Sequence, residues 1–122
     1  MDEILHDCLY PVMLGSNELC HACVRQLQKK YGIGSTVLTG KRAITLRFLP
    51  TVTLVDAPPS LSDELLLSIL SDVELSGGAR IPLLVLCDPH YEGFLRRNRE
   101  GLESRFILRR AEELLGETSY EF

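Results

Sequence analysis

Two cysteines near the start of the chain have the spacing that best suggests chemistry. Cys20-His21-Ala22-Cys23 carries the Cys-x-x-Cys pattern that supports thiol–disulfide exchange. A reactive thiol is favoured at a helix N-terminus, yet Cys20 falls about one turn inside the helix expected here. Both cysteines also share an apolar stripe with Val24 and Leu27. This placement favours buried structural thiols over redox chemistry.

A glycine turn immediately precedes these cysteines and is the second candidate site. A dinucleotide fingerprint requires three glycines, so that the backbone can approach a pyrophosphate closely. Here Gly15 is present, but Asn17 and Cys20 occupy the other two glycine positions. Glu18 also adds negative charge where a phosphate would lie. The sequence therefore argues against NAD or FAD, and leaves open a smaller polar ligand or none at Gly15, Ser16 and Asn17.

A second polar turn, containing Asp88 and His90, follows the most apolar run of the chain. An Asp beside a His is suited to acid–base work, although a helix-capping Asp next to an exposed His is more common. The histidines and cysteines show no ligand spacing beyond the Cys-x-x-Cys, and a second pair to complete a metal site is missing. No nucleophile motif such as G-x-S-x-G is found. We therefore predict no catalytic residue and no metal ligand in this chain.

A strand–helix–strand unit is expected to position the glycine turn. The apolar run Leu9–Leu14 predicts a buried strand, and Ser16 and Asn17 are both good N-caps for the helix that follows. Gly32 is expected to end that helix. The apolar-rich residues 35–38 then predict a second strand.

The remaining elements continue this alternation. The sequence predicts a short strand or an irregular excursion over residues 43–49, a strand over 51–55, and a helix from Ser62 to Gly77. A buried strand is expected over 81–87, followed by a helix from Pro89 to near Ser104. A short strand over 105–108 and a helical segment over 110–115, stopped by Gly116, complete the alternation. Strands alternating with helices indicate an α/β class, a Rossmann-like three-layer domain with a mostly parallel sheet.

The expected strand order brings the two polar turns together. The first strand is predicted to be central, with the next two strands on one side and strand 81–87 on the other. Strand order then reverses between the first strand and strand 81–87, and a crevice is expected beyond their carboxyl ends. Gly15, Ser16 and Asn17 would line one wall of that crevice, and Asp88 and His90 the other.

Length and composition limit the function classes. A chain of 122 residues, 45% hydrophobic and 25% charged, predicts a single globular domain over residues 1–122. A net charge of −4 argues against nucleic acid as a partner. No apolar segment approaches the ~20 residues of a membrane span, and the acidic start lacks a secretory signal. We therefore expect a cytoplasmic protein with no membrane association, whose four cysteines are free thiols.

Residues 96–110 are rich in arginine despite the acidic net charge. The arginines are Arg96, Arg97, Arg99, Arg105, Arg109 and Arg110. Such a patch suits a phosphate or an anionic partner surface. The favoured interpretation is a solvated helix face, balanced by Glu92, Glu100 and Glu103.

Several short motifs in order resemble those of a known family. They are Pro11-Val12-Met13-Leu14-Gly15-Ser16-Asn17, Tyr31-Gly32-Ile33-Gly34-Ser35, and Leu86-Cys87-Asp88 leading into Tyr91-Glu92-Gly93-Phe94-Leu95-Arg96-Arg97-Asn98-Arg99-Glu100-Gly101-Leu102. From about Cys8 to its end, the chain resembles the N-terminal pre-ATP-grasp domain of ATP-grasp carboxylate–amine ligases, of the D-aspartate ligase-like and carbamoyl-phosphate-synthase-like kind. The resemblance lies in the order of the pieces more than in any one motif.

The resemblance implies a substrate-side or scaffold role in ATP-dependent amide formation. In such ligases an ATP-grasp domain binds ATP and Mg²⁺ and activates a carboxylate as an acylphosphate, which an amine then attacks. The implied substrate-binding residues are Gly15, Ser16 and Asn17 in the first turn and Asp88 in the second, with His90 by extension. The implied partners are the ATP-grasp domain of the parent ligase, a small-molecule carboxylate or amine, and a second copy of the chain in a homodimer.

This chain departs from the family pattern where an ATP-grasp domain would begin. The family's lysines and carboxylates that hold ATP and Mg²⁺ are not in it, so no cofactor is expected in this chain and no ligation by it alone. Two alternatives stay open: a thioredoxin-like redox protein that uses Cys20 and Cys23, and a non-enzymatic α/β module that acts through its arginine-rich segment.

Overall fold

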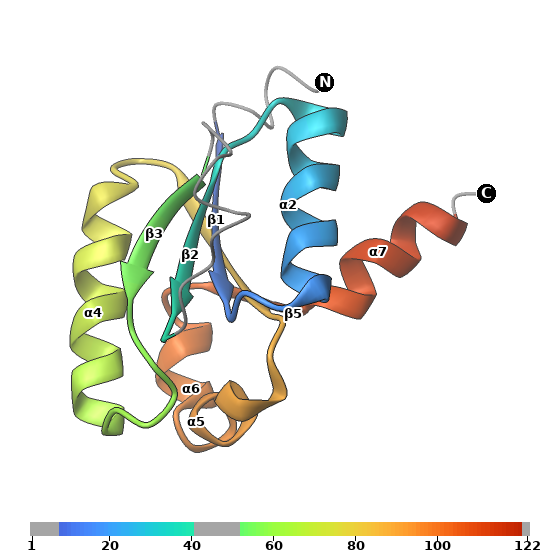
Figure 1. Cartoon of the computed structure of the whole chain (residues 1–122). Helices are drawn as coiled ribbons and strands as arrows, with labels where there is room; N and C mark the ends of the chain where they lie inside the picture. The colour runs from blue at the N-terminus through green and yellow to red at the C-terminus, as the bar shows by residue number, and fades with distance from the viewer. Residues whose placement is uncertain (1–7, 41–51, 121–122) are drawn as a thin grey trace.

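The computed structural model describes residues 8–40 and 52–120, and its centre is a five-stranded parallel sheet (Figure 1). The strands are β1 (Leu9–Leu14), β2 (Ser35–Thr39), β3 (Val52–Asp56), β4 (Ile81–Leu86) and β5 (Ile107–Arg110). Helices flank the sheet, and the predicted α/β class with a Rossmann-like three-layer arrangement is confirmed. The predicted element over residues 43–49 lies outside the described residues.

The strand order is β3-β2-β1-β4-β5, with β1 at the centre as predicted. β1 pairs with β2 through Val12 and Thr36, and with β4 through Leu14 and Leu86. Strand order therefore reverses between β1 and β4, which is the topological switch point of the sheet. The carboxyl ends of these two strands lie side by side.

Side chains alternate between two apolar layers, one on each face of the sheet. Val12 and Leu14 of β1 pack in the layer covered by α4 (Asp63–Ser76), α5 (Glu92–Arg97) and α6 (Arg99–Glu103). Met13, between them, packs in the other layer with residues of α2 (Glu18–Tyr31) and α7 (Ala111–Tyr120). Figure 1 shows α4 and α2 on opposite faces of the sheet. None of the described helices is long and apolar enough to cross a membrane.

The predicted caps of the two long helices are confirmed. Asn17 caps α2 by accepting a hydrogen bond from the Cys20 amide, and Gly32 ends the helix with φ of 69°. Ser62 caps α4 by accepting from the Leu65 amide, and Gly77 ends it. Both caps satisfy amide groups that a first helical turn leaves without a partner.

The single helix predicted from Pro89 to near Ser104 is wrong. The chain instead forms the 3₁₀ turn η1 (Pro89–Tyr91) followed by α5 and α6, which are separated at Asn98. The Asn98 side chain donates to the carbonyl oxygen of Phe94 at 2.9 Å and to Asp63 at 3.0 Å. A short polar side chain that bonds to the preceding turn competes with helix continuation, and this accounts for the break.

Two boundaries near the C-terminal part also differ from prediction. β5 covers Ile107–Arg110 rather than residues 105–108, because the Arg105 and Phe106 amides both donate to the Leu102 carbonyl and extend the turn after α6. α7 runs through Gly116 to Tyr120 instead of stopping there. A helix tolerates an interior glycine at a cost of about 1 kcal/mol, and Leu114 and Leu115 pack α7 against the layer that contains α2.

Candidate functional site

The carboxyl ends of β1 and β4 meet in a tight contact, which we call the β1–β4 junction (Gly15, Asn17, Cys87 and Asp88). Gly15 has φ of 110°, and a Cβ added there would lie 2.4 Å from the Asp88 Cβ and 3.0 Å from its amide nitrogen. The Leu14 carbonyl accepts hydrogen bonds from the Cys87 and Asp88 amides at 3.1 and 3.0 Å. Only glycine allows β4 to approach this turn so closely.

Asn17 joins the helix cap to the neighbouring strand. Its Oδ1 accepts from the Cys20 amide at 3.1 Å, while its Nδ2 donates to the Cys87 carbonyl at 3.0 Å. A cap aspartate would supply the acceptor but no donor, and a serine hydroxyl would have to serve both partners with a single oxygen atom. Asn17 therefore has a structural role at the junction, and both ends of its amide are engaged.

Ser16 points toward the other side of β1. Its hydroxyl hydrogen-bonds to the Thr39 hydroxyl at 2.8 Å, and the Gly15 amide donates to the Leu38 carbonyl at 2.8 Å. These bonds connect the first turn to the end of β2. The first turn is thus held from both neighbouring strands.

Asp88 and His90 form the more exposed part of this edge. The Asp88 carboxylate accepts from the His90 amide at 3.0 Å and lies 2.7 Å from His90 Nδ1. The His90 side chain is 75% exposed and that of Asp88 is 20% exposed. The pair can accept or donate a proton from the solvent side. It also fits the predicted arrangement of a capping Asp beside an exposed His.

Tyr91, in the second turn, connects the junction to the loop after β3. Its hydroxyl donates at 2.6 Å to the carbonyl of Ala57, a buried residue in the loop after β3. Burial, followed by the charges of Asp88 and Asp56, raises the pKa of Tyr91 to about 12. Tyr91 therefore stays protonated and keeps its donor role at any physiological pH.

Three cysteine thiols gather in the apolar layer below the junction. Cys20 and Cys23 of α2 are 0% and 1% exposed, and Cys87 after β4 is 3% exposed. Hydrogen bonds with Cys20 and then Cys23, together with burial, raise the pKa of Cys87. The Cys23 thiol contacts the Ala111 carbonyl at 3.7 Å. The predicted burial of Cys20 and Cys23 is confirmed, and these thiols lack the exposure that redox cysteines require.

The structure thus brings together Gly15, Asn17 and Asp88 as the predicted strand order implied, with Ser16 and His90 on either side. The crevice expected between the two turns is instead a packed contact, because Asp88 lies directly against Gly15. Within residues 8–40 and 52–120, no group of three or more His, Cys, Asp or Glu is arranged to hold a metal ion.

Two residues of this edge were missed from the sequence. Thr39 ends β2 beside the first turn, and Tyr91 reaches across to the loop after β3. The strand order itself contains a signal for Thr39, because the residues that end adjacent parallel strands lie together. Tyr91 gave no comparable signal, since it fits equally well as an ordinary core aromatic.

Comparison with known proteins gives no relative from which a role for these residues could be transferred. The chain matches no family model, no curated protein and no solved structure.

Proposed function

We propose that this chain is the N-terminal, substrate-side or scaffold domain of an ATP-dependent carboxylate–amine ligase, with a pre-ATP-grasp fold. The observation that supports this most is the β1–β4 junction. The motif residues behind the family resemblance, Gly15 to Asn17 and Asp88, come from turns about 70 residues apart in the chain and lie in contact at the switch point of a parallel sheet.

In this proposal the junction is a rigid wall and not a pocket of its own. Gly15 and Asn17 fix the two turns, while Ser16, Asp88 and His90 present polar groups along the carboxyl edge of the sheet. These groups would position a small carboxylate or amine against a partner domain. The ATP-grasp domain would hold ATP and Mg²⁺ and carry out the chemistry. The described residues of this chain include no group of three or more His, Cys, Asp or Glu arranged to hold Mg²⁺.

The test measures ADP release from ATP in the presence of Mg²⁺, a mixture of carboxylates and a mixture of amines. The purified chain is assayed alone and with each ATP-grasp polypeptide encoded by the same genome. We expect no turnover by the chain alone, and carboxylate-dependent ADP release when the correct polypeptide is added. Turnover by the chain alone would contradict the proposal, as would the failure of every such polypeptide to depend on it.

A pair of variants then tests the wall itself. His90→Ala removes an exposed polar group from the edge, and we expect a raised KM for one substrate without loss of folding. Lys29→Ala, on the exposed face of α2, is the matched control and should leave KM unchanged. Equal KM values for both variants and the wild type would show that His90 does not contribute to substrate binding.

A further inference from the structure

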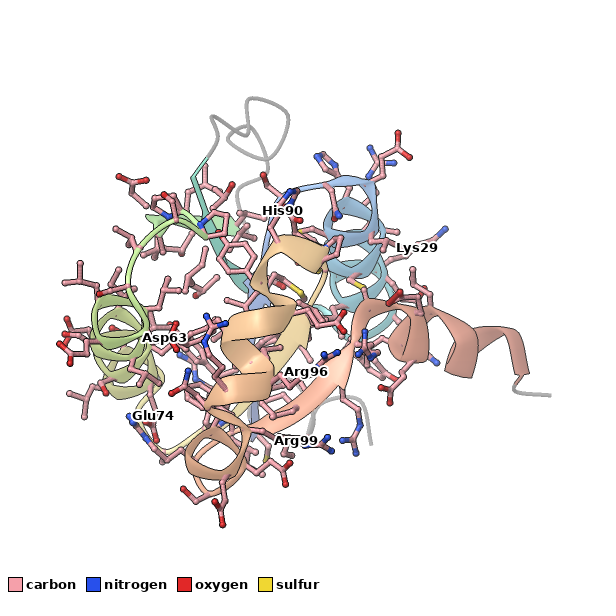
Figure 2. All side chains as sticks on the ribbon, turned by 90° about the horizontal axis from the view of Figure 1, so that it is seen from below. Lys29, Asp63, Glu74, His90, Arg96 and Arg99 are labelled. Atoms are coloured by element: carbon pink, nitrogen blue, oxygen red, sulfur yellow. The ribbon has the colours of Figure 1, made fainter. Side chains whose placement is uncertain are left out.

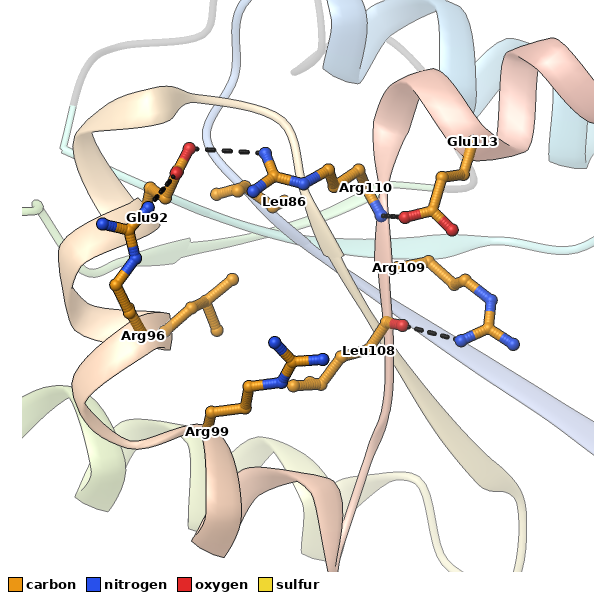
Figure 3. A pocket seen from close by; sticks show the side chains of 9 residues that line it. Leu86, Glu92, Arg96, Arg99, Leu108, Arg109, Arg110 and Glu113 are labelled. Atoms are coloured by element: carbon orange, nitrogen blue, oxygen red, sulfur yellow. Dashed lines mark hydrogen bonds and ion pairs between the residues drawn. The ribbon is translucent and has the colours of Figure 1, made fainter.

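A half-open cavity lies between α5, α6 and the last strand of the sheet, next to the end of β4 but lined by none of the residues of the β1–β4 junction (Figure 3). Its volume is about 170 Å³. Leu86, Leu95 and Leu108 supply its apolar lining. Its polar lining consists of Glu92, Arg96, Arg99, Arg109, Arg110 and Glu113. We call this site the arginine cavity.

The two glutamates of the arginine cavity are already hydrogen-bonded within the protein. Glu92 pairs with Arg96 at 2.7 Å and with Arg110 at 3.3 Å. The Arg110 guanidinium, more than Arg96, lowers the pKa of Glu92, so this carboxylate is charged at neutral pH. Glu113 accepts a hydrogen bond from the backbone amide of Arg110 at 3.3 Å. Four arginines line the cavity, and their acidic neighbours are Glu92 and Glu113 in the lining and Glu103 outside it, so one positive charge is in excess.

Arg109 carries that excess, and Arg99 has its acidic partner outside the cavity. Arg99 pairs with Glu103, which does not line the cavity. Arg109 donates to the Leu108 carbonyl at 2.8 Å and makes no ion pair with any residue in the described part of the chain. Figure 3 shows the two guanidinium groups on either side of Leu108. Each guanidinium offers a planar group of donors at the rim of the cavity, and such a group is well suited to binding an oxyanion.

The other arginines of the same segment serve the fold. Arg97 makes two hydrogen bonds of 2.9 Å to Asp63, and Arg105 pairs with Glu74, so both link α5 and α6 to α4. Figure 2 shows Asp63 and Glu74 on α4, while Arg96 and Arg99 lie toward β5. The predicted solvated face balanced by acidic residues is therefore confirmed for the pairs with Glu92 and Glu103. The arginines around the cavity exceed what that balance requires.

Hydrogen bonds along β5 favour a small ligand over an extended peptide. β5 is the last strand in the sheet order, where an added peptide strand would pair. However, the Leu108 carbonyl is occupied by the Arg109 side chain and the Arg110 amide by the Glu113 side chain. Side chains that occupy the ladder groups of an edge strand block strand addition.

We propose that the arginine cavity binds a small organic oxyanion, a carboxylate or a phosphate monoester. Its charged group lies at the rim of the cavity that carries Arg99 and Arg109, and its apolar group rests on Leu95 and Leu108. The binding is reversible and involves no covalent step. This inference does not depend on the ligase proposal, because the cavity shares no residue with the β1–β4 junction.

The test is a titration of the ¹⁵N-labelled protein, followed by NMR, with four probes: phenyl phosphate, benzoate, inorganic phosphate and benzyl alcohol. We expect saturable shifts at the amides of residues 95–99 and 107–110 with at least one aromatic anion, weaker binding of inorganic phosphate, and no saturation with benzyl alcohol. The tighter of phenyl phosphate and benzoate identifies the charged group. Binding should weaken with added salt, because exposed charges are screened.

Charge-matched variants locate the site. Arg99→Gln with Arg109→Gln should weaken anion binding by about tenfold or more, which corresponds to roughly 1.4 kcal/mol. Arg25→Gln with Lys29→Gln removes the same charge from the exposed face of α2 and should change affinity less than about twofold, as expected when only distant charges differ.

Three results would overturn the proposal: no saturable shift at residues 95–99 and 107–110 with either aromatic anion, equal shifts with benzyl alcohol, or an equal loss in the control pair. If the double variant does not fold, Arg109→Gln alone decides the question. It removes an exposed guanidinium with no described ion pair, and an unchanged affinity would refute the site.

Discussion

The β1–β4 junction and the arginine cavity both lie where β4 ends, yet they use polar groups in opposite ways. At the junction, Asn17 engages both ends of its amide, and Gly15 touches Asp88 with no space between them. At the cavity, Arg99 and Arg109 lie among the residues that line an open volume over leucine side chains. At the junction, the hydrogen-bonding groups are used to hold two turns together. At the cavity, charged side chains remain at the surface.

The difference arises from the neighbouring strands. β1 and β4 are both central, so their turns are crowded, and every backbone group there must find a partner inside the protein. β5 has one paired neighbour in the described sheet, and its side chains other than Leu108 are exposed. Polar residues at a switch point are therefore not in themselves evidence of an empty binding crevice. Substitutions should separate the two regions, with large stability losses at the junction and small ones at the cavity.

The largest loss is expected for Gly15→Ala. The new Cβ would overlap the Asp88 Cβ at 2.4 Å, and alanine would have to adopt φ of 110°. Backbone strain and steric overlap together should lower the free energy of unfolding by roughly 2–5 kcal/mol. Urea denaturation followed by circular dichroism measures this.

Gly101→Ala is the matched control for that substitution. Gly101 lies in α6, and no atom lies within 4 Å of an added Cβ. Alanine there should stabilise the protein by up to about 1 kcal/mol, because it is the better helix former. If both glycine variants changed the free energy of unfolding by the same amount, the close contact described between Gly15 and Asp88 would be refuted.

Asn17→Ala should give the next largest loss. It removes the cap of α2 and leaves the Cys87 carbonyl without its side-chain donor. We expect about 1 kcal/mol for the cap and about 1 kcal/mol more for the lost bond to β4. Ser62→Ala removes only a cap, that of α4, so it should cost about 1 kcal/mol. Equal losses in the two variants would show that Asn17 does not stabilise the junction.

The sequence predicts the fold well because its signals are local and repeated. Asn17, Ser62 and Gly32 mark helix ends by side-chain chemistry that does not depend on distant contacts, and all three were predicted. The break at Asn98 was missed because the Asn98 side chain, besides its local bond to the Phe94 carbonyl, is held by Asp63, which lies 35 positions earlier in the chain. The length of α7 was missed because packing against α2 outweighed a glycine signal.

The candidate site was predicted only in part. The strand order placed Asp88 near Gly15, since topology alone determines which strand ends are adjacent. It could not reveal that the two residues touch, because that depends on distances of a few tenths of an ångström. The arginine cavity was equally hidden. Which arginines pair with α4 and which face β5 depends on how α5 and α6 lie across the sheet.

A smaller effect is expected at the ion pair that binds α5 to α4. Hydrogen bonds from Arg97 and then Asn98 lower the pKa of Asp63 to about 2, from an ordinary value of 3.8. A carboxyl whose pKa is lower in the folded state stabilises the protein above its unfolded pKa, and this contribution is lost as the pH falls through the folded pKa. Asp63→Asn should therefore be less stable than the wild type near neutral pH.

That difference should shrink as the pH falls from about 4 to about 2, where the wild-type carboxyl takes up its proton. Urea denaturation of both proteins across this range measures it. A difference that stays constant with pH would mean that the Asp63 charge does not contribute, and that Arg97 is free to act with the arginines of the cavity.

The smallest effect is expected for Arg109→Gln. Its exposed side chain makes one hydrogen bond, to the Leu108 carbonyl, so the free energy of unfolding should change by less than about 0.5 kcal/mol. The same denaturation assay used for Asn17→Ala provides a direct comparison. If Arg109→Gln lowered the free energy of unfolding as much as Asn17→Ala does, the charge of Arg109 would serve to stabilise the fold, as the junction does. A neutral result leaves the charge of Arg109 without a role in stability, and the arrangement around Leu108 is then explained by what the cavity binds.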